Sequence, residues 1–175
     1  DSFFDRRNVY NGVVPASTGI GMPNASGTAL TAEALTVEPA GDGVEVRAVP
    51  SPGQCSPMEY GSSFSRAVEA TFPDHRRLYV SGTASIDRKG NTVAKGDLAG
   101  QVDTTMSVVH GILDSRDMSW ADTTRAVAYV RRPADVSAVR EQLADYDLPL
   151  VVVPAVICRD ELLFELELDA VTIRS

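Results

Sequence analysis

The fold is decided by the stretch Leu162-Leu163-Phe164-Glu165-Leu166-Glu167-Leu168-Asp169, in which apolar and polar residues alternate. Successive side chains of a β-strand point to opposite faces of its sheet, so this period of two predicts a strand over residues 162–173. One face of that strand is apolar, and the other carries the carboxylates of Glu165, Glu167 and Asp169. We therefore predict a sheet with one face packed against helices and a second, acidic face.

Two amphipathic helices precede this strand. Asp97 is a favourable N-cap, because its side chain can accept a hydrogen bond from a free N–H of the first turn. The apolar stripe of the helix that follows is Leu98, Val102, Met106, Val109 and Leu113. Pro133 is favoured in a first turn and predicts the start of the second helix. The stripe of that helix is Val136, Val139, Leu143 and Tyr146. Both helices must bury one side only, so we expect them on one face of the sheet, with the other face left uncovered.

Five further segments are β-rich and are separated by turn residues. They are 44–49, 65–70, 77–85, 123–130 and 150–157. The predicted order is three strands, a helix, a strand, a helix and two strands. These elements predict an α+β fold with a mixed β-sheet and two helices on one face.

Composition and charge narrow the range of functions. A chain of 175 residues suits one domain with a buried core. We expect residues 1–60, rich in Gly, Pro, Ser and Thr, to form a loop-rich N-terminal arm with a short strand, and residues 61–175 to form one compact unit. The net charge of −8 argues against an extended nucleic-acid footprint, which needs clustered Lys and Arg. No apolar run approaches the ~20 residues of a membrane span and no signal segment opens the chain, so we expect a cytoplasmic protein.

The sequence offers no recognisable metal site. Cys55 and Cys158 match no metal-ligand spacing, and His75 and His110 have no neighbouring ligand residue. We therefore expect no bound metal. A disulfide between the two cysteines is not needed by a chain that can build its own core.

Several motifs resemble the Rid (YjgF/YER057c/UK114) superfamily. They are Val80–Ile86, Gly96-Asp97, Gln101, Pro154-Ala155 and Glu165-Leu166-Glu167. The resemblance implies a fold similar to that of chorismate mutase and a homotrimer with ligand pockets between subunits. Rid proteins that hydrolyse imines carry Arg after Pro-Ala, and this Arg binds the substrate carboxylate. Val156 stands there in this chain and cannot do so, which argues against that reaction.

A second set of motifs resembles the chorismatases, in particular their C-terminal half. They are residues 11–21, 51–54, 60–66 and 158–165. Chorismatases open the enolpyruvyl ether of chorismate by hydrolysis or elimination, release pyruvate and need no cofactor, and the resemblance implies the same here. They also carry a second Rid-like half upstream. The present sequence starts at Asp1 rather than Met, and it leaves open whether such a half precedes it.

Glu165 is the candidate catalytic residue. Opening an enolpyruvyl ether begins with protonation of its methylene carbon, and this needs a carboxylic acid that stays protonated near neutral pH. Burial has that effect, because it disfavours the ionised form. By resemblance, Glu165 matches the general acid of the chorismatases. From the pattern alone, Glu165 and Glu167 would be a solvated stripe, since charged residues are rarely buried.

Arg159 and Arg66 are candidates for binding the two carboxylates of chorismate, because a guanidinium can donate two parallel hydrogen bonds to a carboxylate. The alternative for Arg159 is an ion pair with its neighbour Asp160. The alternative for Arg66 is simple exposure at the surface.

Five further residues are candidates for substrate binding. Cys158 lies where chorismatases that form 3-hydroxybenzoate differ from those that hydrolyse, and a Cys favours the former; a structural thiol is the alternative. Gly82, Thr83 and Ala84 are small enough to leave room for a ring, although small residues also mark a bulge. Tyr60 would hydrogen-bond the substrate or pack at an interface.

Three functions remain open at this stage. The first is a chorismatase-like hydrolase or lyase acting on chorismate or a related cyclic carboxylate. The second is a Rid-like enzyme of specialised-metabolite biosynthesis that acts on another small carbonyl or enol compound. The third is a non-catalytic homotrimer that binds a small ligand. Each implies a small-molecule partner rather than nucleic acid or membrane.

Overall fold

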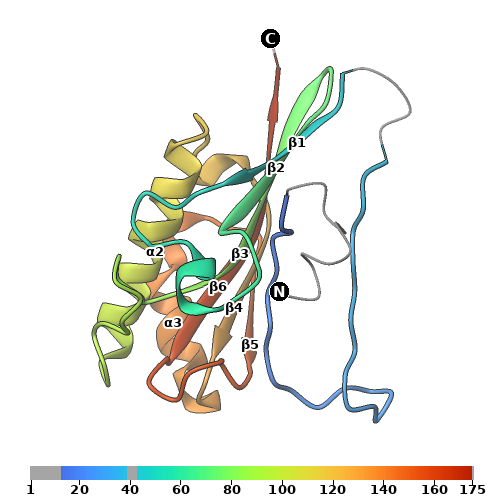
Figure 1. Ribbon diagram of the computed structural model, residues 1–175. Helices are drawn as coiled ribbons and strands as arrows, with labels where there is room; N and C mark the ends of the chain where they lie inside the picture. The colour runs from blue at the N-terminus through green and yellow to red at the C-terminus, as the bar shows by residue number, and fades with distance from the viewer. Residues whose placement is uncertain (1–12, 39–42, 175) are drawn as a thin grey trace.

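The computed structural model describes residues 13–38 and 43–174, so Asn11 and Gly12 of the first chorismatase-like motif lie outside the described residues. Within these ranges the chain forms one six-stranded mixed sheet with two α-helices on one face (Figure 1). The α+β fold predicted from the sequence is confirmed.

The sheet places the C-terminal strand near its centre. In spatial order the strands are β1 (Glu45–Val49), β2 (Ala67–Thr71), β3 (His75–Ala84), β6 (Phe164–Ile173), β4 (Thr123–Val130) and β5 (Leu150–Pro154). Neighbouring strands are antiparallel, except that β4 and β5 are parallel. The edge strand β1 lies within the predicted N-terminal arm, and it pairs with β2 in the same sheet as the rest.

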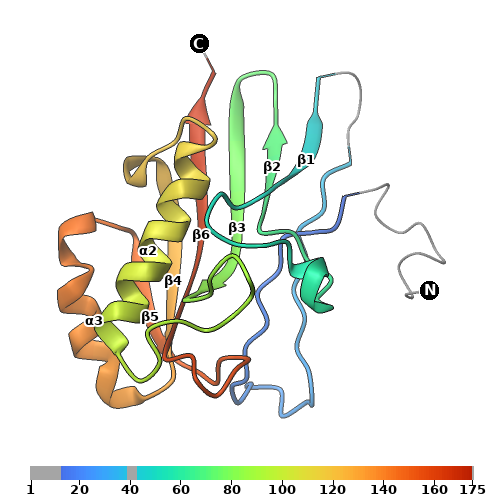
Figure 2. The same cartoon turned by 60° about the vertical axis from the view of Figure 1, so that its left-hand side comes forward.

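The two predicted helices lie side by side on the sheet (Figure 2). The first, α2 (Leu98–Asp114), is capped as predicted, because the carboxylate of Asp97 accepts a hydrogen bond of 3.1 Å from the Gly100 N–H. The second begins with a short 3-10 turn at Pro133–Asp135, and α3 then spans Val136–Gln142. Three other 3-10 turns are described, η1 (Pro57–Tyr60), η2 (Trp120–Asp122) and η4 (Ala144–Tyr146).

The main core lies between these helices and the sheet. Phe164, Leu166 and Leu168 of β6 are fully buried there, as their alternation predicts. The helices contribute Val102, Met106, Val109, Leu113 and Val139. The apolar face of the strand therefore builds the core, and Glu165, Glu167 and Asp169 point to the second face. None of the helices in the described ranges is long and apolar enough to cross a membrane.

The second face is not entirely uncovered, because residues 13–21 run along it on the side opposite the helices (Figure 1). The Ser17 N–H donates to Ser81 Oγ over 2.9 Å, and the Gly82 N–H donates to Thr18 Oγ1 over 2.9 Å. Gly21 and Val156 exchange two backbone hydrogen bonds of 2.8 and 2.7 Å. These contacts link residues more than sixty positions apart, and they make segment 13–21 a wall over one end of the sheet.

Candidate active site

A cavity of about 530 Å³ lies beneath this wall. It is bounded by segment 13–21, the region around η1, the end of β3, the start of β6 and the loop before β6. Its lining residues are Ser17, Gly19, Tyr60, Ser62, Ser63, Phe64, Arg66, Gly82, Ala84, Ile86, Cys158, Arg159, Leu162 and Glu165. The fold thus brings together all the predicted site residues except Thr83.

Thr83 lies on the opposite side of β3. It is paired in register with Leu166, whose side chain is in the main core, and it is fully buried. Its hydroxyl donates to the Ser81 carbonyl over 2.8 Å. The geometry therefore gives Thr83 a structural contact rather than a contact with the cavity.

Glu165 is buried in the wall of the cavity with only 5% of its surface exposed. Its register neighbours are Ala84 on β3 and Tyr129 on β4. Burial, followed by the nearby charge of Glu167, raises the pKa of Glu165 to about 7. In the part of the chain that the structure describes, no side chain forms an ion pair with it. Glu165 can therefore hold a proton near neutral pH, unlike the solvated stripe that the pattern alone suggests.

Glu167, two residues along the same face, has a different environment. Its carboxylate forms an ion pair with Arg125 of β4. Glu165 and Glu167 therefore differ in their surroundings: Glu167 is paired with a cation, and Glu165 is enclosed beside the cavity.

Gly82 leaves the space that the Glu165 carboxyl group occupies. It lies at an irregularity of β3, where the register with β6 shifts between Val80 and Thr83. A Cβ atom at position 82 would collide with Glu165 Oε1 and would lie 2.9 Å from Thr18 Cγ2. Glycine is therefore the residue that allows the acid to sit against the strand at this point.

Arg66 is buried, with 3% of its surface exposed, and its guanidinium lines the cavity. Its Nε donates to the Cys55 carbonyl over 3.1 Å, and its Nη2 donates to the Tyr60 hydroxyl over 3.0 Å. The guanidinium carbon lies 5.6 Å from the ring centre of Tyr60 and 5.5 Å from that of Phe64. Burial raises the pKa of Tyr60, although Arg66 opposes the effect. The phenol is therefore a neutral hydrogen-bonding group.

Arg159 approaches the same aromatic ring. Its guanidinium carbon lies 5.5 Å from the Tyr60 ring centre, and its Nη1 donates to the Gly90 carbonyl over 2.7 Å. Its neighbour Asp160 pairs instead with Arg131, over 3.7 Å. Within residues 13–38 and 43–174, neither Arg66 nor Arg159 has a carboxylate within 4.0 Å. Two cations thus line the cavity without an anion beside them.

The loop that carries Cys158 and Arg159 is held by two side chains from other elements. Arg131, just after β4, donates to the carbonyls of Ile157 and Leu162, each over 2.7 Å, and also to that of Arg159. Gln101 of α2 accepts from the Leu163 N–H over 2.8 Å and donates to the Glu161 carbonyl over 2.8 Å. The motif glutamine at position 101 thus has a direct structural role.

Both cysteines are free. Cys158 is exposed at the cavity, and the protein around its thiol, together with the Glu165 carboxyl group, raises its pKa. A raised pKa disfavours the reactive thiolate, so the geometry favours a contact role for this residue over a nucleophilic one. In the described ranges no cluster of three or more His, Cys, Asp or Glu residues is arranged to hold a metal ion.

The sequence predictions did not assign Ser62, Ser63, Phe64 or any residue of segment 13–21 to the site. Both regions nevertheless belong to motifs that resemble the chorismatases. The resemblance to the chorismatases therefore indicated that these two regions belong to the site, although it did not indicate which of their side chains face the cavity. Ile86 and Leu162 were also missed, and as apolar lining residues they carry no chemical signature.

Comparison with known structures agrees with this architecture, although no family model matches the chain. A Rid family protein from Yersinia pestis aligns with a TM-score of 0.61 and 19% identity, over 72% of this chain and 98% of that one. A YjgF/YER057c/UK114 family member from Mycobacterium tuberculosis aligns with a TM-score of 0.55 and 23% identity, over 73% of this chain and 100% of that one. The chain therefore has the Rid fold.

A chorismatase aligns with a TM-score of 0.64 and 26% identity, over 72% of this chain. The aligned part is 44% of the chorismatase, so the present chain matches less than half of that protein. The resemblance to the Rid superfamily and to part of a chorismatase, which the sequence predicts, is confirmed.

Proposed function

We propose that the chain is a chorismatase-like enzyme that cleaves the enolpyruvyl ether of chorismate, or of a related cyclic carboxylate, and releases pyruvate. The observation that carries the proposal is Glu165, a buried acid with a pKa raised to about 7 in the wall of a cavity that also contains two arginines, neither of which has an acidic partner among the described residues. The arginines could bind the carboxylates of an anionic substrate, and the protonated acid could transfer its proton to a carbon atom of that substrate.

The reaction we propose begins at Glu165. Its carboxyl proton is transferred to the methylene carbon of the enol ether, so that a C–H bond forms, the C=C π bond breaks and positive charge develops on the ether carbon. Water then adds to this carbon and gives up a proton to the Glu165 carboxylate. The resulting hemiketal then collapses: the bond between its central carbon and the ring oxygen breaks, its hydroxyl proton passes to that oxygen, and pyruvate and a ring hydroxyl group result. Glu165 ends protonated, ready for another cycle.

Substrate binding in this proposal depends on Arg66 and Arg159. Each retains N–H groups that can donate to a carboxylate, and Arg binds carboxylates through paired hydrogen bonds. Tyr60 fixes the spacing of the two cations, because both guanidinium groups lie against its ring. A substrate with two carboxylates would bridge them over the phenol.

The experiment is incubation of the purified protein with chorismate and detection of pyruvate with lactate dehydrogenase and NADH. We expect pyruvate above the enzyme-free blank, and a rate reduced about a hundredfold or more in Glu165→Gln, which keeps the shape but removes the acid. Glu141→Gln serves as the matched control, since Glu141 is an exposed glutamate of α3 and lies outside the cavity. No pyruvate from the unaltered protein, with chorismate or with related enol ethers, would refute the proposal.

The same material tests the two other functions. Thermal stabilisation by a small carbonyl or enol compound, without stabilisation by chorismate, would favour a different substrate. Ligand binding that survives replacement of both Glu165 and Arg159 would favour a binding protein.

We also propose that the part of the second face left open by segment 13–21 meets other copies of the chain in a homotrimer. Light scattering after gel filtration measures the mass of that assembly directly.

A further inference from the structure

A second cluster of arginines lies around Glu69, away from the cavity described above. Glu69 of β2 is paired in register with Leu78, so it faces the helices, and none of its surface is exposed. Arg116, which follows α2, donates to its carboxylate from Nε over 2.9 Å and from Nη2 over 3.1 Å. Arg47 of β1 donates over 2.5 Å, and Arg76 of β3 lies at 3.4 Å.

This cluster carries more positive than negative charge. Burial alone would raise the pKa of Glu69, but hydrogen bonds from Arg116 and Arg47 outweigh burial and lower it, so the carboxylate is ionised at neutral pH. One carboxylate then faces three guanidinium groups, which leaves two positive charges in excess. Asp117 lies near Arg116, but the described residues give Arg116 an ion pair with Glu69 alone.

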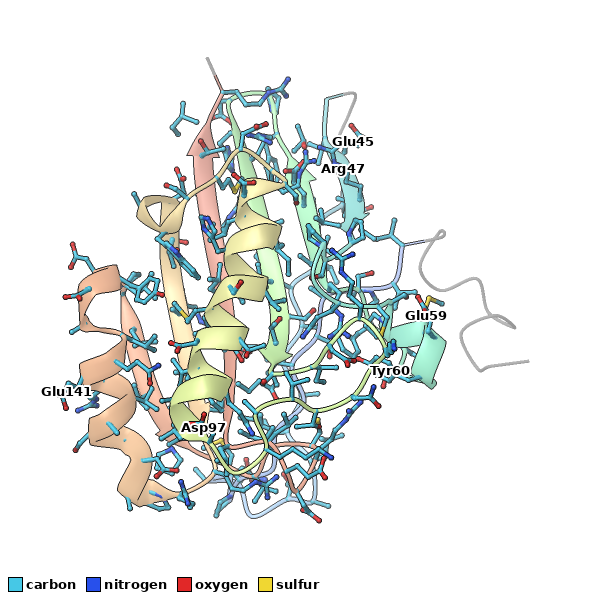
Figure 3. The ribbon with its side chains drawn as sticks, turned by 90° about the vertical axis from the view of Figure 1, so that its left-hand side faces the viewer. Glu45, Arg47, Glu59, Tyr60, Asp97 and Glu141 are labelled. Carbon is cyan, nitrogen blue, oxygen red and sulfur yellow. The ribbon has the colours of Figure 1, made fainter. Side chains whose placement is uncertain are left out.

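A cavity of about 300 Å³ opens beside the cluster. Arg47 and Arg116 both line it, together with the hydroxyl-bearing residues Ser51 and Ser115. Figure 3 shows Arg47 on β1, well separated from Tyr60 of the first cavity. The Ser115 hydroxyl donates to the Ile112 carbonyl over 2.7 Å, whereas the Ser51 hydroxyl accepts from the Gly53 N–H and keeps its proton to donate. Two cationic side chains and the Ser51 hydroxyl are therefore the groups that could bind a small molecule in this space.

We propose that this second cavity binds a phosphate group, either as free phosphate or carried on a small metabolite. Arg47 and Arg116 use only part of their donors on Glu69, and the planar guanidinium group matches phosphate oxygens. A phosphate group with close to two negative charges would offset the excess charge of the cluster. Glu69 then acts as a positioning residue that holds the two guanidinium groups at the edge of the cavity.

Isothermal titration calorimetry with inorganic phosphate, at constant ionic strength maintained with chloride, tests the proposal. We expect one saturable site per chain that is weakened about tenfold or more in Arg47→Gln, because a charge-assisted hydrogen bond is lost. Arg47 has the most exposed side chain of the three, so its replacement leaves Glu69 paired with Arg116 and Arg76. A parallel titration with glycerol 3-phosphate tells whether a carried phosphate binds more tightly than the free ion.

Two further variants keep the test decisive. Arg159→Gln removes a cation of the first cavity and is expected to leave phosphate binding unchanged. If Arg47→Gln does not fold, Ser51→Asp places a negative charge in the second cavity without removing any partner of Glu69, and it is expected to abolish binding. The proposal is wrong if no saturable binding occurs, if binding survives both Arg47→Gln and Ser51→Asp, or if Arg159→Gln abolishes it. These outcomes concern phosphate binding and not pyruvate release, so failure of this proposal would not contradict the proposed reaction.

Discussion

Glu69 and Glu165 are two buried glutamates of one sheet with opposite electrostatic environments. Glu69 lies on the helix-covered face and contacts three arginines, and against the effect of burial Arg116 and Arg47 hold its pKa below the ordinary value. Glu165 lies on the other face, has no cationic partner among the described residues and has its pKa raised to about 7 by burial and by Glu167. Burial is common to both, so the neighbouring charges decide which glutamate is a structural anion and which can donate a proton.

The largest difference is expected when each glutamate is replaced by glutamine. Glu69→Gln leaves three guanidinium groups without their buried counter-charge, and we expect it to lower the free energy of unfolding by about 4 kcal/mol. Glu165→Gln removes no ion pair and spares the protein the ionisation of a buried acid, so we expect it to raise the free energy of unfolding at pH 7 by up to about 3 kcal/mol. Urea denaturation of both variants measures this contrast, and equal losses would show that the two environments do not differ as described.

The pH dependence of stability should separate the same two residues. The pKa of Glu165 is raised from 4.5 to about 7 by folding, so its contribution is fully present below pH 4.5 and is lost as the pH rises through 7. The loss amounts to roughly 3 kcal/mol. The pKa of Glu69 is lowered by folding, so its contribution is present above its ordinary pKa and is lost as the pH falls through the folded value.

Unfolding free energies measured from pH 8 down to about pH 2 check both signs, because the Glu69 contribution is lost only below its ordinary pKa. The difference in stability between Glu165→Gln and the unaltered protein should grow in favour of the variant as the pH rises. A difference that is constant with pH would mean that the Glu165 pKa is not raised.

A smaller effect is expected from Gly82→Ala, which sharpens the comparison because it displaces the Glu165 carboxyl group without changing any charge, although the added Cβ also presses on Thr18 Cγ2. The added Cβ would displace the Glu165 carboxyl group, with a stability cost of about 1–2 kcal/mol. We expect kcat/KM for pyruvate release to fall about tenfold because the acid is misplaced. Gly19→Ala is the matched control: Gly19 also lines the cavity, but a Cβ there would meet nothing within 4 Å. Equal losses in both variants would contradict this role of Gly82.

The smallest effect is expected from Tyr60→Phe. The variant loses the 3.0 Å hydrogen bond from Arg66 but keeps the ring against both guanidinium groups. We expect a loss of about 1 kcal/mol in substrate binding, seen as a few-fold higher KM with kcat nearly unchanged. A large fall in kcat instead would indicate that the phenol takes part in the chemistry.

Local patterns predicted the elements better than the site. The alternation along β6 and the N-cap at Asp97 depend on neighbouring residues, and both predictions are confirmed. Segment 13–21 folds back onto β3 through contacts across 64 positions, and no local pattern encodes such a contact. Glu69 escaped attention for a related reason. It lies in the buried strand Ala67–Thr71, where little alternation marks its face, and two of its three arginine partners, Arg47 and Arg116, are 22 and 47 positions away.

The central position of β6 has a consequence for biosynthesis. Until the ribosome releases the final residues of this stretch, β3 and β4 lack the strand that joins them, and the two parts of the sheet expose open edges. Nascent chains should therefore acquire protease resistance in this domain in a single step, once β6 has emerged, rather than progressively. A stop codon placed before Phe164 should yield an aggregation-prone product rather than a smaller folded protein.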